Sequence, residues 1–215
     1  KSTPGSGELL LKREDKELRT TAYLSEVEQR SGIVVSDWTT FREDGLRYFS
    51  GTATYRTRFT AKASEKCEID LGDVRDIARV RLNGMDIGVA WHFPFRVSAD
   101  GALKDGENVL EVEVTNGWHN RLLGDKTLPD DCEWGPLRFH QCAMDGSKGV
   151  CGNGLKRIPD WAWKTDGSRP STNRVTFTTW DYFTKGGELV PSGLIGPVHI
   201  LTPHPGRGFD TRDLL

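Results

Sequence analysis

The chain has 215 residues, which is near the upper end for one all-β domain and short for two ordinary domains. Its 29 Lys and Arg residues nearly balance 31 Asp and Glu residues, so no general charge attracts it to nucleic acid or to an acidic membrane surface. No apolar run approaches the roughly 20 residues that a membrane-spanning helix needs. The unusual features are seven tryptophans and 24 glycines, and core packing is the default explanation for the tryptophans.

The N-terminal segment, residues 1–32, shows little regular pattern. Residues 1–7 are small and polar, which is typical of a flexible linker. Residues 8–11 form a candidate first strand, and residues 12–18 are charged without an apolar stripe. We therefore expect a linker followed by a segment that cannot be assigned.

From residue 48 onward the sequence alternates with the period of two that half-buried strands show. In 52–59, 77–82 and 109–115, every second residue suits a core face. The Asn83-Gly84 pair between alternating runs indicates a type I′ hairpin, because that turn needs positive φ at both central residues. The remaining predicted elements are strands at 69–71, 85–89, 95–98, 175–179 and 198–201, and a turn at 105–108.

Short strands separated by Gly, Asn and Asp turns predict an all-β fold, a β-sandwich or jelly roll, over residues 33–202. No long segment has the 3.6-residue period of a helix. The stretch 129–173 breaks the strand rhythm and is interpreted as a long insertion, which is usually functional when it is ordered. Residues 203–215 are expected to be a C-terminal tail.

Three of the four cysteines lie close together in this insertion. A zinc site would combine Cys132, His140, Cys142 and Cys151, but the paired C-x2-C spacing of zinc sites is missing. One disulfide within the cluster, or free thiols, fits the spacing better, and Cys67 lies apart from the others.

Several segments occur in an order that resembles a known domain type. These are YFSGTATY at 48–55, DLGDV at 70–74, VRLNG at 80–84, PFRV at 94–97 and GENVL at 106–110. The set resembles the galactose-binding-like sandwich of glycoside hydrolases, including the sugar-binding domain of family 2 β-glycosidases. Three later segments make it most similar to the terminal sandwich of family 106 α-L-rhamnosidase-like proteins: VTNGWHNRLLGD at 114–125, TTW at 178–180 and PSGLIGPV at 191–198.

The resemblance implies a non-catalytic module of an exported bacterial enzyme that degrades polysaccharide, with no catalytic residue of its own. Its expected partners are a polysaccharide or oligosaccharide and the catalytic domain of the same parent chain, outside the cell, on its surface or in the periplasm. No cofactor is expected to be required. Related sandwiches often hold a structural calcium ion, and Asp73, Asp76 and Asp100 lie in predicted loops that could supply oxygen ligands.

A sugar site needs an aromatic ring for the C–H face of the sugar and polar groups for its hydroxyls. The first candidate cluster is the loop that contains Trp91 and His92, followed by Phe93. The alternative interpretation is that Trp91 and Phe93 plug the end of the sandwich.

The second candidate cluster follows the predicted strand 109–115. Trp118 and His119 are its ligand candidates, together with Arg121. An Arg–carboxylate pair can also fix a loop, so Asn116, Arg121 and Asp125 are interpreted as mainly structural.

The third candidate cluster combines Trp134, Trp161, Trp163, Trp180 and Tyr182. If the local chain is extended, Trp161 and Trp163 point to the same side and form a platform of two rings. The alternative is a small aromatic core that anchors the insertion.

These observations lead to one preferred function and one alternative. The preferred function is binding of plant-type glycan, such as pectic or hemicellulosic polysaccharide, through exposed aromatic rings. The alternative is a purely structural domain that packs on the catalytic barrel of its own enzyme, in which case all seven tryptophans would be buried. An independent hydrolase is a distant third, because no motif selects a pair of catalytic carboxylates.

Overall fold

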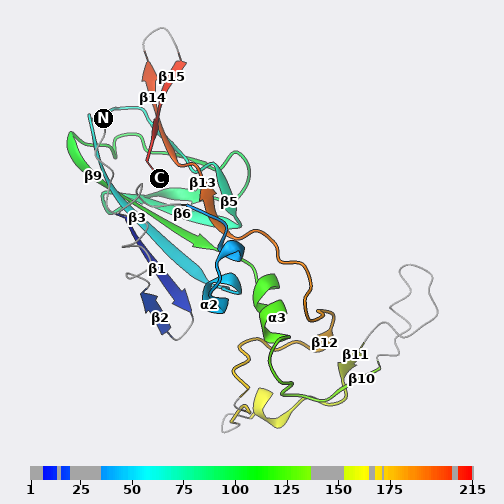
Figure 1. Ribbon diagram of the computed structural model, residues 1–215. Helices are drawn as coiled ribbons and strands as arrows, with labels where there is room; N and C mark the ends of the chain where they lie inside the picture. The colour runs from blue at the N-terminus through cyan, green and yellow to red at the C-terminus, as the bar shows by residue number, and fades with distance from the viewer. Residues whose placement is uncertain are drawn as a thin grey trace. The chain divides into compact units, whose positions relative to one another are not determined.

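The computed structural model describes residues 7–13, 16–19, 35–136, 153–164, 168–170, 172–204 and 208–214. The chain divides into two compact units (Figure 1). Unit 1 comprises Lys1–Trp118 and Val190–Leu215, and unit 2 comprises His119–Leu189. Unit 2 is wider at both ends than the predicted insertion at 129–173.

Unit 1 is an antiparallel β-sandwich, which confirms the predicted all-β class. Its largest sheet has the order β2 (Lys16–Arg19), β1 (Gly7–Arg13), β3 (Thr52–Ala61), β9 (Gly106–Thr115), β6 (Ile77–Leu82) and β7 (Met85–Ala90). A second sheet has the order β15 (Gly208–Asp213), β14 (His199–His204), β4 (Glu68–Asp70) and β8 (Arg96–Ser98). A third pairs β13 (Gly193–Gly196) with β5 (Asp73–Arg75), and two short helices, η1 (Trp38–Thr40) and α2 (Asp44–Arg47), precede β3.

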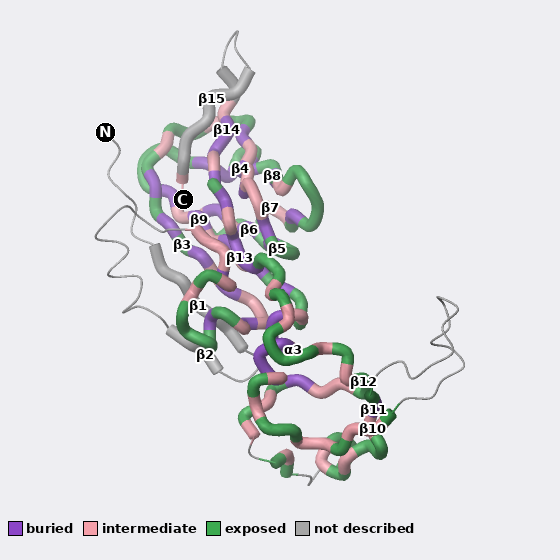
Figure 2. The backbone as a smooth tube through the Cα atoms, turned by 45° about the vertical axis from the view of Figure 1, so that its right-hand side comes forward, coloured by how far each residue is buried: buried purple, intermediate pink, exposed green. Residues whose placement is uncertain are grey.

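The core of unit 1 follows the alternation that the sequence predicts. Alternate residues of each central strand are buried (Figure 2). Their side chains pack with those of the second sheet into one hydrophobic cluster. On the largest sheet these are Ala53, Tyr55 and Phe59 of β3, Ala78, Val80 and Leu82 of β6, and Leu110, Val112 and Val114 of β9. The opposite face of the same strands carries charged pairs such as Arg81–Glu113, with 2.7 Å between nitrogen and oxygen.

The predicted hairpin between β6 and β7 is confirmed. Asn83 and Gly84 both have positive φ, at 54° and 79°, as a type I′ turn requires. The Asn83 side chain also ties the turn to its surroundings, because its Oδ1 accepts a 3.0 Å hydrogen bond from the Val109 N–H.

The predicted turn at 105–108 is only partly correct, because β9 already begins at Gly106, opposite Ala61. The side chain of Asn108 closes the loop instead. Its Oδ1 accepts from the Lys104 N–H at 3.0 Å and its Nδ2 donates to the Lys104 carbonyl at 2.9 Å. A buried side chain thus makes the loop bonds and leaves the backbone free to pair as a strand.

The end of the sandwich next to η1 is sealed by one tryptophan. The Trp38 Nε1 donates to the Tyr55 hydroxyl at 2.6 Å, and that oxygen also accepts from the Leu194 N–H at 3.1 Å. Gly193 lies against the indole with a φ of 98°, and a Cβ there would come within 2.4 Å of the ring. Glycine is therefore required at this position, both because φ is positive and because a Cβ would collide with the indole.

The chain leaves unit 1 and returns to it at two adjacent points. On the leaving side, Asn116 accepts from the Gly51 N–H at 3.0 Å and donates to the Phe49 carbonyl at 2.8 Å. Its amide nitrogen also donates to the hydroxyl of Ser192 on the returning side at 3.3 Å. The Ser192 N–H donates in turn to Asp37 at 3.0 Å.

Both ends of the chain contribute strands to unit 1. β1 includes the predicted strand at 8–11 and pairs with β3, and β2 extends the same sheet. In the segment expected to be a tail, β15 pairs with β14 along six residues. For β2 and β15 the sequence signal was weak because both are edge strands, where one neighbour supplies the hydrogen bonds whatever the side-chain pattern.

Unit 2 contains little regular structure among its described residues. Its elements are α3 (His119–Asp125), β10 (Trp134–Pro136), β11 (Asn153–Leu155), η3 (Asp160–Ala162) and β12 (Trp180–Asp181). The three strands form one small antiparallel sheet, in the order in which they occur in the chain. None of the helices in the described parts of the chain has the length and apolar character that crossing a membrane requires.

The predicted strand at 175–179 is wrong. The segment forms no strand, and its only backbone bond to one runs from the Leu155 N–H to the Thr179 carbonyl at 3.1 Å among the described residues, because the Asp125 carboxylate at the end of α3 holds its first two residues. This carboxylate accepts from the N–H groups of Val175 and Thr176, at 2.9 and 2.7 Å, and from the Thr176 hydroxyl at 2.7 Å.

Candidate functional site

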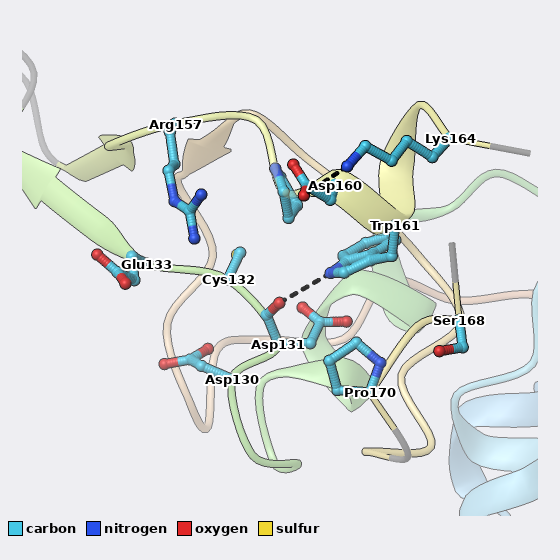
Figure 3. Close-up of a pocket in the computed structure, with 11 residues that line it drawn as sticks. Asp130, Asp131, Cys132, Glu133, Arg157, Asp160, Trp161, Lys164, Ser168 and Pro170 are labelled. Carbon is cyan, nitrogen blue, oxygen red and sulfur yellow. Dashed lines mark hydrogen bonds and ion pairs between the residues drawn. The ribbon is translucent and has the colours of Figure 1, made fainter. Parts of the chain in front are cut away.

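Unit 2 contains an open pocket of about 680 Å³ (Figure 3). Its walls come from the segment that precedes β10, from the turn after β11 and from η3. The lining residues are Asp130, Asp131, Cys132, Glu133, Arg157, Pro159, Asp160, Trp161, Lys164, Ser168 and Pro170. The pocket thus combines one aromatic ring with several charged groups.

Trp161 is fixed firmly in the pocket wall. Its indole Nε1 donates to the Asp131 carbonyl at 3.1 Å (Figure 3). Phe177 meets the ring edge to face, with centroids 5.1 Å apart, and the Arg169 guanidinium lies 4.6 Å from the ring centroid. The ring remains partly exposed. It is therefore held in one orientation, as a sugar-contacting ring needs to be.

Two arginines brace the segment that precedes β10. Arg169 contacts the buried carboxylate of Asp131 at 2.6 Å, and Arg174 contacts the exposed carboxylate of Asp130 at 2.6 Å. Arg174 also donates to the carbonyls of Leu128 and Pro129, at 2.9 and 2.6 Å. These bonds to fixed acceptors set the shape of one wall without using apolar contacts.

The other polar residues of the pocket are more exposed. Asp160 pairs with Lys164 at 2.8 Å, and this hydrogen bond with the lysine charge lowers the pKa of the Asp160 carboxyl. Glu133 faces Lys156 at 3.8 Å, and both are exposed. The Arg157 guanidinium is directed into the pocket (Figure 3). Hydrogen-bond donors and acceptors therefore line the same space.

The cysteine in the pocket wall is unsuited to act as a nucleophile. Burial raises the pKa of the Cys132 thiol to about 11, with a further contribution from the nearby Asp131 and Asp130 carboxylates. Since only the thiolate is nucleophilic, the group is inert at neutral pH. Cys132 and Cys67 are both free thiols, so a disulfide that includes Cys132 is not formed. Cys142 and Cys151 lie outside the described residues.

The small sheet brings together three of the other predicted site residues. Trp134 is partly buried, and the Lys126 Nζ lies 4.8 Å from the centroid of its ring. Trp180 and Tyr182 are 47% and 65% exposed, and their ring centroids are 5.3 Å apart. The His119 Nε2 lies 3.1 Å from the Glu188 carbonyl oxygen, and its ring contacts Phe183 edge to face.

The predicted two-ring platform of Trp161 and Trp163 is not formed. Its premise was an extended chain, but Asp160–Ala162 form the 3-10 helix η3. The Asp160 carbonyl accepts from the N–H groups of Trp163 and Lys164, at 3.3 and 3.0 Å, which keeps the chain turned. Trp163 is exposed and does not line the pocket.

The candidates of unit 1 lie at its surface. Trp91 and Phe93 are 67% and 82% exposed, so the interpretation that they plug the end of the sandwich is wrong. Trp91 meets His92 edge to face, with centroids 4.7 Å apart. Trp118 is also exposed. Of the seven tryptophans, only Trp38 is fully buried.

Arg121 is buried in unit 2, and its side chain is 10% exposed. Its Nη2 forms an ion pair of 2.7 Å with Asp125, which is buried too. Because this pair holds α3 to the 175–176 segment, Arg121 is not accessible in the way that the aromatic candidates are. Its proposed contact with ligand stays a prediction.

The described residues contain no group of three or more side chains arranged to hold a metal ion. Asp73 pairs with Arg75, Asp76 accepts from the Gly117 N–H, and Asp100 accepts from the Cys67 N–H. The three acids predicted for calcium thus serve different parts of unit 1. His140, Cys142 and Cys151 of the zinc hypothesis lie outside the described residues.

Sequence reasoning did not identify the charged residues of the pocket. Glu133, Arg157 and Asp160 belong to no spacing pattern, and they meet only because short turns bring three segments together. The available signal was the run of acids at 130–133 close to a tryptophan-rich segment.

The sandwich topology of unit 1 defines a galactose-binding-like domain. A model of the glycosyl hydrolase 2 galactose-binding domain-like family matches residues 30–148, more than half of the chain, and the chain belongs to this family. This confirms the resemblance to accessory domains of glycoside hydrolases.

Two relatives agree with this assignment. A protein of Formosa agariphila that carries the provisional name beta-glucuronidase is 42% identical over 171 residues, which is 77% of this chain and 13% of that protein. The solved structure of a rhamnosidase from Novosphingobium sp. PP1Y matches with a TM-score of 0.58 and 25% identity, over 93% of this chain and 15% of that one. The chain therefore spans a small part of the enzymes to which it is similar.

A β-glucuronidase from Ruminococcus gnavus also matches, at 23% identity over 54% of this chain and 20% of that one. Its TM-score of 0.39 is too low to support an inference.

Proposed function

We propose that this accessory domain binds carbohydrate, and that the pocket of unit 2 receives one sugar residue of a plant-type, pectic or hemicellulosic, glycan. The observation that carries the proposal is the partly exposed Trp161 ring, fixed in a pocket whose other walls supply hydrogen-bond donors and acceptors. The relatives support the choice of ligand class, because their names refer to rhamnosides and glucuronides.

The chemistry of the pocket suits a sugar. The C–H face of a pyranose lies against Trp161, because aromatic rings carry large apolar surfaces of fixed orientation. The sugar hydroxyls donate to the carboxylates of Asp160 and Glu133 and accept from Arg157. Affinity is expected in the micromolar to millimolar range, because ordering costs offset much of the gain from one ring and a few hydrogen bonds.

In this proposal the domain is not catalytic and requires no cofactor. The bond-breaking step belongs to another domain of the parent chain, and the enzyme acts outside the cell or in the periplasm. The proposal also leaves Cys132 as a structural thiol, consistent with its pKa of about 11.

The proposal is tested by calorimetric titration of the full chain with pectic and hemicellulosic polysaccharides, after a glycan array. We expect Arg157→Gln to weaken affinity several-fold and Trp161→Ala to abolish binding. Trp91→Ala serves as the matched control, because it removes an exposed tryptophan of unit 1 and leaves the pocket intact. If no glycan binds, or if Arg157→Gln and Trp161→Ala retain full affinity, the proposal is wrong.

A second candidate function is docking on the catalytic domain of the parent enzyme. The observation in its favour is the exposed pair Trp91 and Phe93 in the loop between β7 and β8. Exposed aromatic residues of this size are typical anchors of protein interfaces. This surface belongs to unit 1, and the proposed sugar pocket belongs to unit 2.

A further inference from the structure

The small sheet of unit 2 has two chemically different faces. In its register, Trp134 lies opposite Leu155, and Gly135 lies opposite Gly154, which in turn lies opposite Trp180. Because side chains alternate along a strand, Trp134 and Asp181 share one face, and Trp180 shares the other with the two glycines.

The face that carries Trp134 and Asp181 packs inside unit 2. Lys126, just after α3, pairs with the Asp181 carboxylate, and the same ammonium lies 4.8 Å from the Trp134 ring centroid. One lysine thus pairs with Asp181 and contacts the Trp134 ring, which holds this face against α3. The sheet is therefore oriented, and on its second face Glu133, Lys156 and Trp180 are exposed while Gly154 is buried.

The second face, called the outer face, consists of Glu133, Gly135, Gly154, Lys156, Trp180 and Tyr182. Trp180 and Tyr182 project from it and are about half and two-thirds exposed. The Lys156 side chain lies over Gly135, since a Cβ on that glycine would be 2.9 Å from the Lys156 Cγ. The two rings are tilted by 58°, so they form two walls of a corner rather than one plane.

The outer face is continuous with the pocket. Glu133 belongs to both, because it lines the pocket and its carboxylate faces the Lys156 ammonium at 3.8 Å. Arg157, the next residue after Lys156, lines the pocket as well. Trp180 is two strands away from Glu133, a distance of about 10 Å across the sheet. A ligand that reaches from Trp161 to Trp180 is therefore larger than a single sugar.

We infer that the outer face is a second contact site for the same glycan, so that the ligand class of unit 2 is an oligosaccharide chain rather than a terminal monosaccharide. This inference rests on the proposed function of the pocket. One sugar occupies the pocket against Trp161. The chain then passes the Lys156–Glu133 pair, and a later sugar stacks on Trp180 beside Tyr182.

Each residue of the outer face has a distinct part in this binding. Trp180 supplies apolar contact for a sugar face, and Tyr182 supplies its ring edge and a hydroxyl that can donate or accept. Lys156 and Glu133 provide a donor and an acceptor between the two stacking positions. The absence of a side chain at Gly135 leaves the space in which the Lys156 side chain lies.

The test is a titration series that varies ligand length on the full chain. The probes are rhamnose and galacturonic acid as monosaccharides, a rhamnogalacturonan tetrasaccharide and a xyloglucan heptasaccharide. For the wild type we expect at least tenfold tighter binding of one of the oligosaccharides than of the monosaccharides. We expect Trp180→Ala to weaken oligosaccharide binding about fivefold, equivalent to about 1 kcal/mol, and to leave monosaccharide binding unchanged.

Two further variants keep the test decisive. Tyr182→Ala removes the more exposed ring without touching β12, so its effect does not depend on whether Trp180→Ala folds. Trp180→Phe should restore part of the oligosaccharide affinity, which a merely structural role in the sheet would not require. Trp91→Ala again serves as the control and should change neither affinity.

The outcomes separate the two proposals. Equal affinity for monosaccharide and oligosaccharide, or unchanged oligosaccharide affinity in both Trp180→Ala and Tyr182→Ala, overturns the second contact site while Trp161→Ala still supports the pocket. Absence of binding to every probe overturns the pocket for these glycans and the second contact site with it.

Discussion

The interactions that stabilise unit 1 internally differ from those that stabilise unit 2 internally. Every member of the hydrophobic cluster belongs to unit 1, where three central strands bury one face completely. Among the described residues of unit 2, Leu123 is the only large apolar side chain that is fully buried. The buried positions of unit 2 include Asn120, Arg121, Asp125 and Thr176 instead.

This difference determines how the stability of each unit responds to a substitution. Apolar packing is non-directional, so a sandwich tolerates modest change at many positions. A network of buried ions and hydrogen bonds depends on every partner, because a group left without its partner retains the full desolvation penalty. Unit 2 therefore depends on a few residues, and Asp125 has the most bonds among them.

The largest effect is expected from Asp125→Asn. Removing the charge leaves Arg121 buried without its counter-ion, at a cost of about 3–5 kcal/mol. We expect faster amide hydrogen exchange in α3 and at Val175 and Thr176, while β3, β6 and β9 keep their protection. Hydrogen exchange followed by mass spectrometry measures both regions in one sample.

Asp130→Asn is the matched control for this variant, because Asp130 also pairs with an arginine but its side chain is 54% exposed. The Arg174 side chain is 8% exposed, but it keeps its bonds to the Leu128 and Pro129 carbonyls and the Asp130 carboxylate contacts water, so the loss should be about 1 kcal/mol. Equal effects of the two variants, or loss of protection that spreads to β9, would contradict the contrast between the units.

In unit 1, Leu110→Ala is expected to lower the free energy of unfolding by a comparable amount. The loss should affect the strands of the large sheet together. Leu110 lies on β9 between β3 and β6 and is completely buried. The cavity and the lost burial cost about 2–5 kcal/mol, and protection should fall across the whole sheet. Denaturant unfolding measures the loss. Ile77→Ala, on the exposed face of β6, should stay within about 0.5 kcal/mol of wild type, and a similar loss there would argue against the assigned core.

The smallest effect at neutral pH is expected from Tyr55→Phe. The variant leaves the Trp38 indole N–H and the Leu194 N–H without their acceptor, which costs about 1–3 kcal/mol. It also changes the pH dependence, because burial raises the pKa of Tyr55 from 10.0 to about 12. A raised folded-state pKa gives stability that is present below pH 10 and is lost as the pH rises toward 12.

The measurement for this variant is the free energy of unfolding at neutral pH and between pH 10 and 12. The wild type should lose about 2–3 kcal/mol more than Tyr55→Phe over that range. Burial also raises the pKa of Cys67, to about 11, and its contribution is common to both proteins and cancels in the comparison. Parallel pH profiles would show that Tyr55 is not the group responsible.

The sequence predictions were more accurate for unit 1 than for unit 2. In unit 1, residues such as Val80 and Val112 obey the period of two because one sheet face is buried, so the strands and the Asn83-Gly84 turn could be predicted. In unit 2, the bonds run between side chains and backbone groups far apart in sequence, as from Asp125 to Thr176. A β-branched run at 175–179 then resembles a strand that the fold never pairs.

The candidate site was predictable only in part, for a related reason. Trp161, Trp180 and Tyr182 were predicted because a sugar site needs aromatic rings and these three lie in or just beyond the insertion, outside the strands predicted for the sandwich. Arg157 and Asp160 have no distinguishing neighbours in sequence, and Glu133 is marked only by the nearby Asp130 and Asp131 and by Trp134. Their meeting depends on β10 pairing with β11 and on the turn of η3, which no periodicity encodes.

The hydrogen bond between Asn116 and Ser192 has a consequence for how such domains diversify. It joins the two points where the chain departs from the sandwich and comes back, so the sandwich is closed at that edge whatever lies between them. Residues 119–189 are in this sense an insertion between two joined points of the sandwich. Their length and chemistry can change while the hydrophobic interior of unit 1 stays as it is.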